Sequence, residues 1–153
     1  VRTVSFGSLY PTLRRLQQQG DIVEDASAAT ATRPPATTRR GRKTYRITTG
    51  GEATLAGLLD EPGAASFTDD GFGVHLAFFD RTPGPARVRL LEGRRRVLEE
   101  RREGQRDAAT RTGPTELRYA RQLTLLGLET SERELRWINE LIRTENPSQG
   151  EPL

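Results

Sequence analysis

The 153-residue chain contains no cysteine and a single histidine, His75. Without cysteine the chain cannot form a disulfide framework, a thiolate metal site or a cysteine nucleophile, and one histidine leaves little for zinc chemistry or a Ser/His/Asp relay. The sequence also lacks a phosphate-binding glycine loop. We therefore predict that the protein is not an enzyme, that it needs no cofactor or metal, and that His75 is a packing or surface residue.

Long apolar runs are also missing. The longest, "VHLAFF" at residues 74–79, is far too short to cross a membrane, and the N-terminus lacks the charged-then-apolar layout of a secretion signal. With 33% hydrophobic and 29% charged residues, the composition supports only modest cores in a helix-rich protein. We expect no membrane association and a cytoplasmic location.

The positive charge is concentrated at one end of the chain. Up to Asp60 there are nine Lys and Arg against five Asp and Glu, and beyond it fifteen against sixteen. Coding bias explains why 23 of the 24 basic residues are arginine, but it does not explain this distribution. A concentrated basic surface is the electrostatic footprint of a nucleic-acid-binding protein.

The N-terminal part predicts a helix, a hairpin and a second helix. Leu9, Leu13 and Leu16 recur at helical spacing and predict a buried face on a helix that Gly20 ends. Pro11 either lies in the first turn of a helix capped by Ser8, or interrupts a helix that begins near Ser5.

The segments "DIVED" and "RKTYRIT" predict two strands, joined by a long basic loop over residues 26–41. The stretch Thr49-Gly50-Gly51-Glu52 fits a capping box that opens the second helix, which ends near Asp60.

The composition changes after this helix, and we place a linker at residues 61–71. Periodicity leaves Phe72 to Phe79 open as a helix or a strand. A charged helix follows from Pro83 to about Arg106. A last helix runs from residue 115 to about 144, in which Gly127 and the capping-box match at Ser131 leave either a kink or a break open. A disordered tail occupies residues 147–153.

The last helix carries an apolar stripe that it cannot bury alone. A second copy of the chain is the economical partner, although an intramolecular helical hairpin would use the same residues. The predicted dimerisation residues are Leu123, Leu126, Leu135, Ile138, Leu141 and Ile142. Trp137 is most simply a core residue, and the alternative places it in an effector pocket at the dimer interface, as in similar helices of some relatives of the family named below.

Two motifs carry a family resemblance. The pattern G-[ST]-L-Y-P-x-L-x-x-L-x-x-x-G-x-I is met by Gly7, Ser8, Leu9, Tyr10, Pro11, Leu13, Leu16, Gly20 and Ile22. A later basic-aromatic strand followed by Thr and Gly is met by Tyr45, Arg46, Thr48 and Gly51. With both motifs the chain resembles the PadR family of transcriptional regulators, and its C-terminal stretch is similar, more loosely, to the helical dimerisation domain of one branch of that family.

The resemblance implies a mainly α fold with a small β-hairpin wing: a winged helix-turn-helix at residues 1–60 and a helical dimerisation domain at residues 72–146. Members of the family begin with two further helices, whereas this sequence starts at Val1, just before the recognition helix. We expect a fragment, or a reading frame called from a downstream GTG, in which the DNA-binding domain lacks its first helices.

By resemblance, the first helix of this chain is the recognition helix, which enters the major groove with its N-terminal residues toward the bases. Its expected DNA-contacting residues, with the two that precede it, are Arg2, Thr3, Ser5, Ser8, Tyr10, Pro11, Thr12, Arg14 and Arg15. In the wing they are Arg39, Arg40, Arg42 and Lys43. We expect Ser8, Tyr10 and Pro11 to meet bases and the arginines to meet phosphates.

The leading hypothesis is therefore a homodimeric regulator that binds double-stranded DNA, acts as a repressor and responds to a small-molecule effector; repression and ligand control come from the resemblance alone. The alternative is a truncated interaction protein that pairs with a full-length sibling through its C-terminal helices without productive DNA binding.

Overall fold

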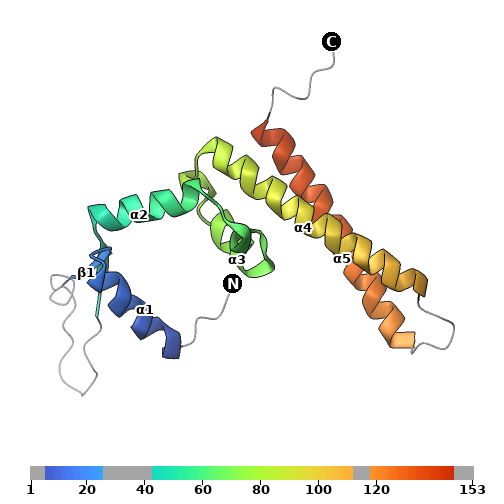
Figure 1. Cartoon of the computed structure of the whole chain (residues 1–153), viewed down its shortest axis with the longest axis horizontal. Helices are drawn as coiled ribbons and strands as arrows, with labels where there is room; N and C mark the ends of the chain where they lie inside the picture. The colour runs from blue at the N-terminus through green and yellow to red at the C-terminus, as the bar shows by residue number, and fades with distance from the viewer. Residues whose placement is uncertain (1–5, 26–42, 112–117, 147–153) are drawn as a thin grey trace, which may run out of the picture. The chain divides into compact units, whose positions relative to one another are not determined.

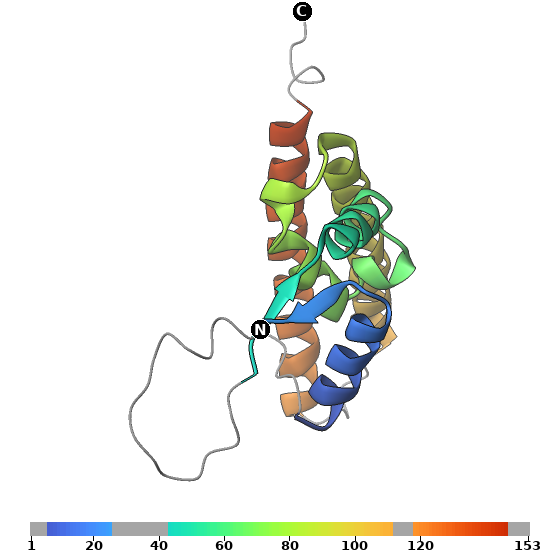
Figure 2. The same cartoon turned by 90° about the vertical axis from the view of Figure 1, so that its left-hand side faces the viewer.

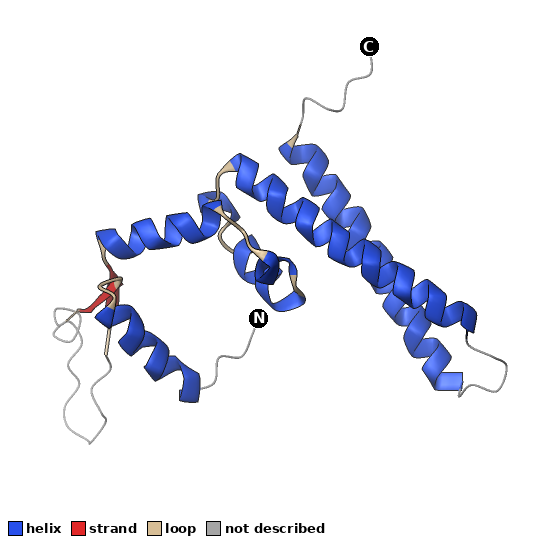
Figure 3. Ribbon diagram, viewed as in Figure 1, coloured by secondary structure: helices blue, strands red, loops and turns tan. Residues whose placement is uncertain are grey.

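The computed structural model of the chain describes residues 6–25, 43–111 and 118–146. Helices dominate these residues, with one small sheet of two strands (Figures 1 and 3). The chain divides into two compact units, residues 1–58 and 59–153. The predicted fold class, mainly α with a small hairpin, is confirmed. The whole predicted loop and the whole predicted tail lie outside the described residues.

The first unit opens with α1, Phe6–Gln18. Gly20 ends it in the left-handed region at φ 79°, where the Asp21 amide donates to the Leu16 carbonyl at 2.9 Å and the Gly20 amide to that of Gln17 at 3.1 Å. This Schellman geometry satisfies carbonyls that the helix leaves free, so Gly20 acts as predicted. The leucine stripe is less covered than predicted: Leu13 and Leu16 are half-buried and Leu9 is exposed, because β1 is the main element packed against α1.

A two-stranded antiparallel sheet and a second helix complete this unit. Strand β1, Ile22–Glu24, pairs with β2, Tyr45–Ile47, in the register Ile22↔Ile47 and Glu24↔Tyr45. Helix α2, Thr49–Asp60, follows at once. Its first turn is capped by Thr48 rather than by Thr49 as the capping-box pattern predicted.

Thr48 also joins α2 to the turn after α1. Its hydroxyl donates to the Gly20 carbonyl at 2.6 Å and accepts from the Gly51 amide at 3.0 Å. Its backbone amide donates to the Asp21 carbonyl at 2.9 Å. A Cβ on Gly51 would lie 2.0 Å from that same carbonyl oxygen, so only glycine lets the helix approach the turn this closely.

The second unit begins where the sequence predicted a linker. Residues 64–67 form the 3-10 helix η2, Ala64–Phe67, and helix α3, Asp69–Leu76, starts inside the same stretch. Phe67 packs against the core, and a Cβ on Gly93 would lie 2.4 Å from its ring. The linker prediction is therefore wrong for residues 64–71, because Ser66 is buried and Phe67 packs against the core there. Helix α3 settles the helix-or-strand ambiguity in favour of a helix as far as Leu76.

After the 3-10 helix η3, Phe79–Arg81, the long helices α4, Gly84–Arg111, and α5, Arg118–Glu145, lie side by side in both views (Figures 1 and 2). They enclose a core of Phe72, Leu90, Leu91, Leu98, Leu135 and Ile138. Helix α5 runs through Gly127 and Ser131 without a break, so the predicted break does not occur. A Cβ at Gly127 would lie 2.6 Å from the end of the flexible Gln105 side chain, and the Ser131 hydroxyl donates to Gln105 Oε1 at 3.0 Å.

Helix α5 has two apolar faces. Leu135 and Ile138 are buried against α4, and Leu141 and Ile142 pack at the edge of the same core. These four predicted dimerisation residues therefore serve the intramolecular hairpin, the alternative left open by the sequence. Leu123 and Leu126 lie on a different face and are exposed.

Trp137 is not enclosed in the core. Its side chain is exposed on one side, while its ring packs edge-on against Phe72 with the ring centroids 6.3 Å apart and the planes at 88°. The simple prediction of a core residue is thus only partly correct. No helix in the described part of the chain is both long and apolar enough to span a membrane.

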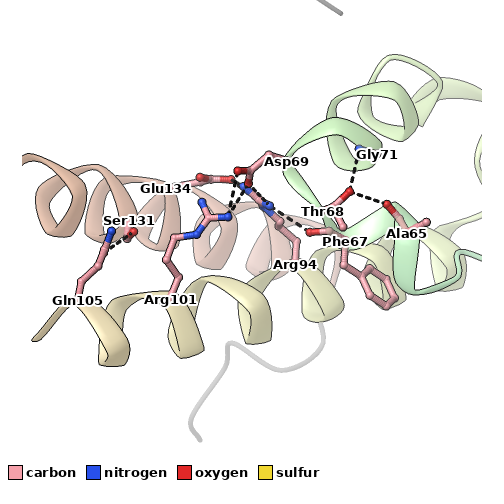
Figure 4. Close-up of polar contacts among 10 residues, drawn as sticks. All are labelled: Ala65, Phe67, Thr68, Asp69, Gly71, Arg94, Arg101, Gln105, Ser131 and Glu134. Atoms are coloured by element: carbon pink, nitrogen blue, oxygen red, sulfur yellow. Dashed lines mark hydrogen bonds and ion pairs between the residues drawn. The ribbon is translucent and has the colours of Figure 1, made fainter. Parts of the chain in front are cut away.

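The buried Arg94 side chain lies at the centre of an ionic cluster in the second unit (Figure 4). Its guanidinium donates to Glu134 at 2.6 and 2.8 Å and to the Phe67 carbonyl at 3.0 Å, and it pairs with Asp69 at 2.7 Å. It also lies over the Phe72 ring at 5.4 Å from the centroid. This one side chain joins α3, α4, α5 and the end of η2.

Candidate nucleic-acid interface

A groove of about 730 Å³ lies between α1 and the base of the β-hairpin. Helix α1 contributes its outer side chains, and the hairpin contributes the end of β1 and the start of β2. The lining residues are Tyr10, Pro11, Arg14, Arg15, Gln17, Gln18, Glu24, Lys43 and Tyr45. All belong to the first unit, so the groove is formed within one compact body.

Helical spacing explains why the α1 side chains that line the groove lie together. Tyr10, Arg14, Gln17 and Gln18 stand at i, i+4, i+7 and i+8, and therefore share one face of α1. The leucine stripe begins one residue earlier, at Leu9, and occupies another face. The side chains that can contact a ligand are thus separated from those that pack.

Pro11 is the sixth residue of α1. This agrees with the second predicted alternative, in which Pro11 interrupts a helix that begins near Ser5. A proline there has no amide to donate to the Gly7 carbonyl one turn back. Nearby, the Thr12 hydroxyl donates to the Ser8 carbonyl at 2.8 Å. The first turns of α1 therefore depart from regular helical hydrogen bonding at the end expected to face DNA.

The groove gathers some of the predicted contact residues and not others. Tyr10, Pro11, Arg14, Arg15 and Lys43 line it together. Ser8 and Thr12 do not line it, and Thr12 bonds to its own helix. The remaining predicted residues lie outside the described part of the chain; they are Arg2, Thr3, Ser5, Arg39, Arg40 and Arg42.

The charge of the groove is mainly positive. Arg14, Arg15 and Lys43 provide three cationic groups, and Glu24 provides one carboxylate. Lys43 and Glu24 form an ion pair with the ammonium nitrogen 3.0 Å from Oε2. This hydrogen bond, followed by the charge of the carboxylate, raises the pKa of Lys43 above its ordinary value. Two guanidinium groups with planar donor forks suit the oxygens of a phosphodiester.

Comparison with known proteins agrees with this geometry. Residues 1–57 match the model of the transcriptional regulator PadR-like family, a range that covers α1, the sheet and most of α2. The N-terminal unit is a PadR-like domain. No curated protein matches the chain significantly. The family is one of transcription regulators, and the match to it covers residues 1–57 of the chain.

Sequence reasoning missed one charged residue of the PadR-like domain. Glu24 was assigned only to a strand, yet its carboxylate lies in the basic groove. The register of the hairpin contains the signal: Glu24 pairs with Tyr45, and Lys43 stands two residues before Tyr45 on the same side of the strand. The pairing partner could not be read from the sequence because the long connecting loop leaves the register undefined.

Proposed function

We propose that the chain is a homodimeric transcriptional repressor that inserts α1 into the major groove of its operator and holds the flanking phosphates with the basic groove. The observation that carries this proposal is the placement of Arg14, Arg15 and Lys43 around one groove in a domain that matches the PadR-like family. Repression and release by a small-molecule effector rest on the family resemblance alone.

The geometry supports different roles for the two ends of α1, base contacts near its N-terminus and phosphate contacts further along. Tyr10 and Pro11 lie nearer the N-terminus, the end that a recognition helix directs to base edges. Arg14 and Arg15 lie one turn further on and belong to the phosphate contacts, which position the protein without reading sequence. Loss of an arginine should therefore weaken binding to all duplexes alike.

The test is a fluorescence anisotropy titration of a labelled duplex carrying the chain's own promoter, repeated across salt concentrations. For Arg14→Ala/Arg15→Ala we expect weaker binding and a slope of log K against log salt that is lower by about 1.8, at about 0.9 per phosphate contact. The control Arg96→Ala/Arg136→Ala removes two exposed positive charges from the second unit and should leave the slope unchanged. Absence of binding to any duplex at low salt would contradict the proposed function.

The proposed homodimer uses the second apolar face of α5. Tyr119, Leu123, Leu126 and Trp137 stand at i, i+4, i+7 and i+18, which 3.6 residues per turn bring onto one face, and all four are exposed. An exposed apolar stripe on a charged helix needs a partner, and a two-fold axis lets the same stripe on a second copy supply it.

Leu123 and Leu125, two residues apart in α5, give a matched test of this stripe. Leu123 is 70% exposed and Leu125 is 42% exposed, and two residues of helix place them about 200° apart, on opposite sides. Leu123→Asp should yield a monomer in size-exclusion chromatography with light scattering, whereas Leu125→Asp should leave a dimer. If both variants keep the wild-type mass, the stripe is not the dimer interface. A dimer that binds no DNA would instead favour the interaction-protein alternative.

A further inference from the structure

The basic groove contains an acidic side chain that a simple phosphate-binding surface would not need. The Glu24 carboxylate lies 3.0 Å from the Lys43 ammonium, and both side chains are largely exposed to solvent. An exposed ion pair contributes little to stability. Its place among Arg14 and Arg15 is therefore better explained by its effect on a ligand than by its effect on folding.

The backbone fixes this pair. Glu24 is the last residue of β1 and stands opposite Tyr45, and the Asp25 amide donates to the Thr44 carbonyl at 2.8 Å. The backbone hydrogen bonding between the two strands therefore continues to Thr44, the residue next to Lys43. Cross-strand diagonal neighbours are close enough for long side chains to meet. The hairpin brings the two charges together whenever it is formed.

A carboxylate in this position competes with DNA. A phosphate that approaches Lys43 must displace Glu24 or accept its repulsion, so the pair presents almost no net charge to the duplex. We propose that Glu24 is an internal competitor for Lys43, which lowers the affinity and the salt dependence of DNA binding by this groove. The inference rests on the proposed function, because it concerns how the same groove meets the DNA backbone.

Competition by Glu24 can be measured in the salt dependence of DNA binding. Each lysine that neutralises a phosphate releases counterions and steepens the salt dependence by about 0.9 in log K per log salt. A lysine that is already neutralised by a carboxylate releases almost no counterions when DNA binds. Freeing Lys43 should therefore add close to one phosphate contact to the slope, an effect that a purely structural ion pair would not produce.

The experiment measures the full chain with the labelled promoter duplex across salt concentrations. For Glu24→Gln we expect a two- to fivefold rise in affinity at moderate salt, the range that an exposed pair allows, and a slope steeper by about 0.9. Glu52→Gln is the matched control: it removes one exposed negative charge from the same unit, outside the groove, and should change neither quantity appreciably. Thermal melts followed by circular dichroism verify that both variants fold.

A double-mutant cycle separates competition from general electrostatics. Lys43→Gln should weaken binding only slightly, because Glu24 already pairs with the ammonium group. In the Lys43→Gln background, Glu24→Gln should raise the affinity and the slope much less than it does in the wild-type chain, so that the double variant stays close to Lys43→Gln. The inference is overturned if Glu24→Gln behaves like Glu52→Gln, or if its gain persists undiminished in the Lys43→Gln background. A wild-type chain that binds no duplex would overturn the proposed function itself, which is a distinct outcome.

Discussion

Arg94→Met tests the ionic cluster that joins the elements of the second unit. The Arg94 side chain is 4% exposed, so its charge depends on Glu134, Asp69 and the Phe67 carbonyl rather than on water. Methionine keeps most of the length and the packing on Phe72, and it is a good helix former within α4. The substitution therefore removes the charge and its hydrogen bonds with little other change.

The expected loss follows from the exposure of the partners. Breaking a buried pair by removing one member costs about 3–5 kcal/mol because the other charge is left without compensation. The Glu134 and Asp69 side chains are 27% and 62% exposed, so water can hydrate both after the substitution. We therefore expect a loss at the low end, about 3 kcal/mol.

Arg101 provides the matched control. It donates to both Asp69 oxygens at 2.9 and 3.0 Å from the same helix, but its side chain is 38% exposed. Arg101→Met should therefore cost less than about 1 kcal/mol. Urea unfolding followed by far-UV circular dichroism measures both losses. Trp137, the only tryptophan, gives a local fluorescence signal because its ring packs on Phe72 beneath Arg94.

The pH dependence gives a second check on the cluster. Hydrogen bonds from Arg101 and then Arg94 hold the pKa of Asp69 below its ordinary value of 3.8. Because the folded pKa is lowered, the contribution of Asp69 to stability is present above pH 3.8 and is lost as the pH falls through the folded pKa. The difference in the free energy of unfolding between wild type and Arg94→Met should therefore become smaller as the pH falls through this range. Equal losses for Arg94→Met and Arg101→Met, or a gap independent of pH, would refute the reasoning.

Two further predictions concern single residues. Gly51→Ala should destabilise the first unit and abolish DNA binding, because its Cβ would lie 2.0 Å from the Asp21 carbonyl oxygen. The control Gly50→Ala should be tolerated, since the nearest atom to its Cβ lies at 3.6 Å. Thermal melting and DNA titration compare the two variants, and equal behaviour would contradict the prediction. Burial lowers the pKa of His75, whose Nε2 lies 2.8 Å from the Ser66 hydroxyl, so the unfolded chain binds more protons and stability should fall as the pH drops below about 6.5. In His75→Asn this part of the pH dependence should disappear in urea titrations, and its persistence would exclude His75 as the cause.

The sequence predicted the local elements of the first unit well because their signals are local. The stripe of Leu9, Leu13 and Leu16 gave the helix, and Gly20 gave its end, since a left-handed residue there needs no tertiary partner. The hairpin followed from two short strand patterns around a loop. The cap of α2 shifted by one residue to Thr48, because Thr48 is held by the Gly20 carbonyl, a contact between segments far apart in the sequence.

Partner choice could not be predicted in the second unit. An apolar stripe shows that a helix has a face to bury, but not against what. Leu135 and Ile138 were therefore grouped with Leu123 and Leu126, although the structure buries the first pair against α4 and leaves the second exposed. Arg94 was hidden for a similar reason, since it stands in a run of charges that reads as a solvated surface while its own side chain turns inward.

The motif shared with PadR-like regulators divides physically into residues that face a ligand and residues that hold the groove in shape. Tyr10 and Pro11 line the groove, whereas Thr48 and Gly51 lie away from it. Thr48 joins the turn after α1 to the first turn of α2, and Gly51 lets that helix come close. Since the turn also leads into β1, these contacts fix the angle between α1 and the hairpin, and hence the width of the groove. If the proposed function is correct, a substitution at Thr48 or Gly51 will therefore weaken DNA binding although it removes no DNA contact.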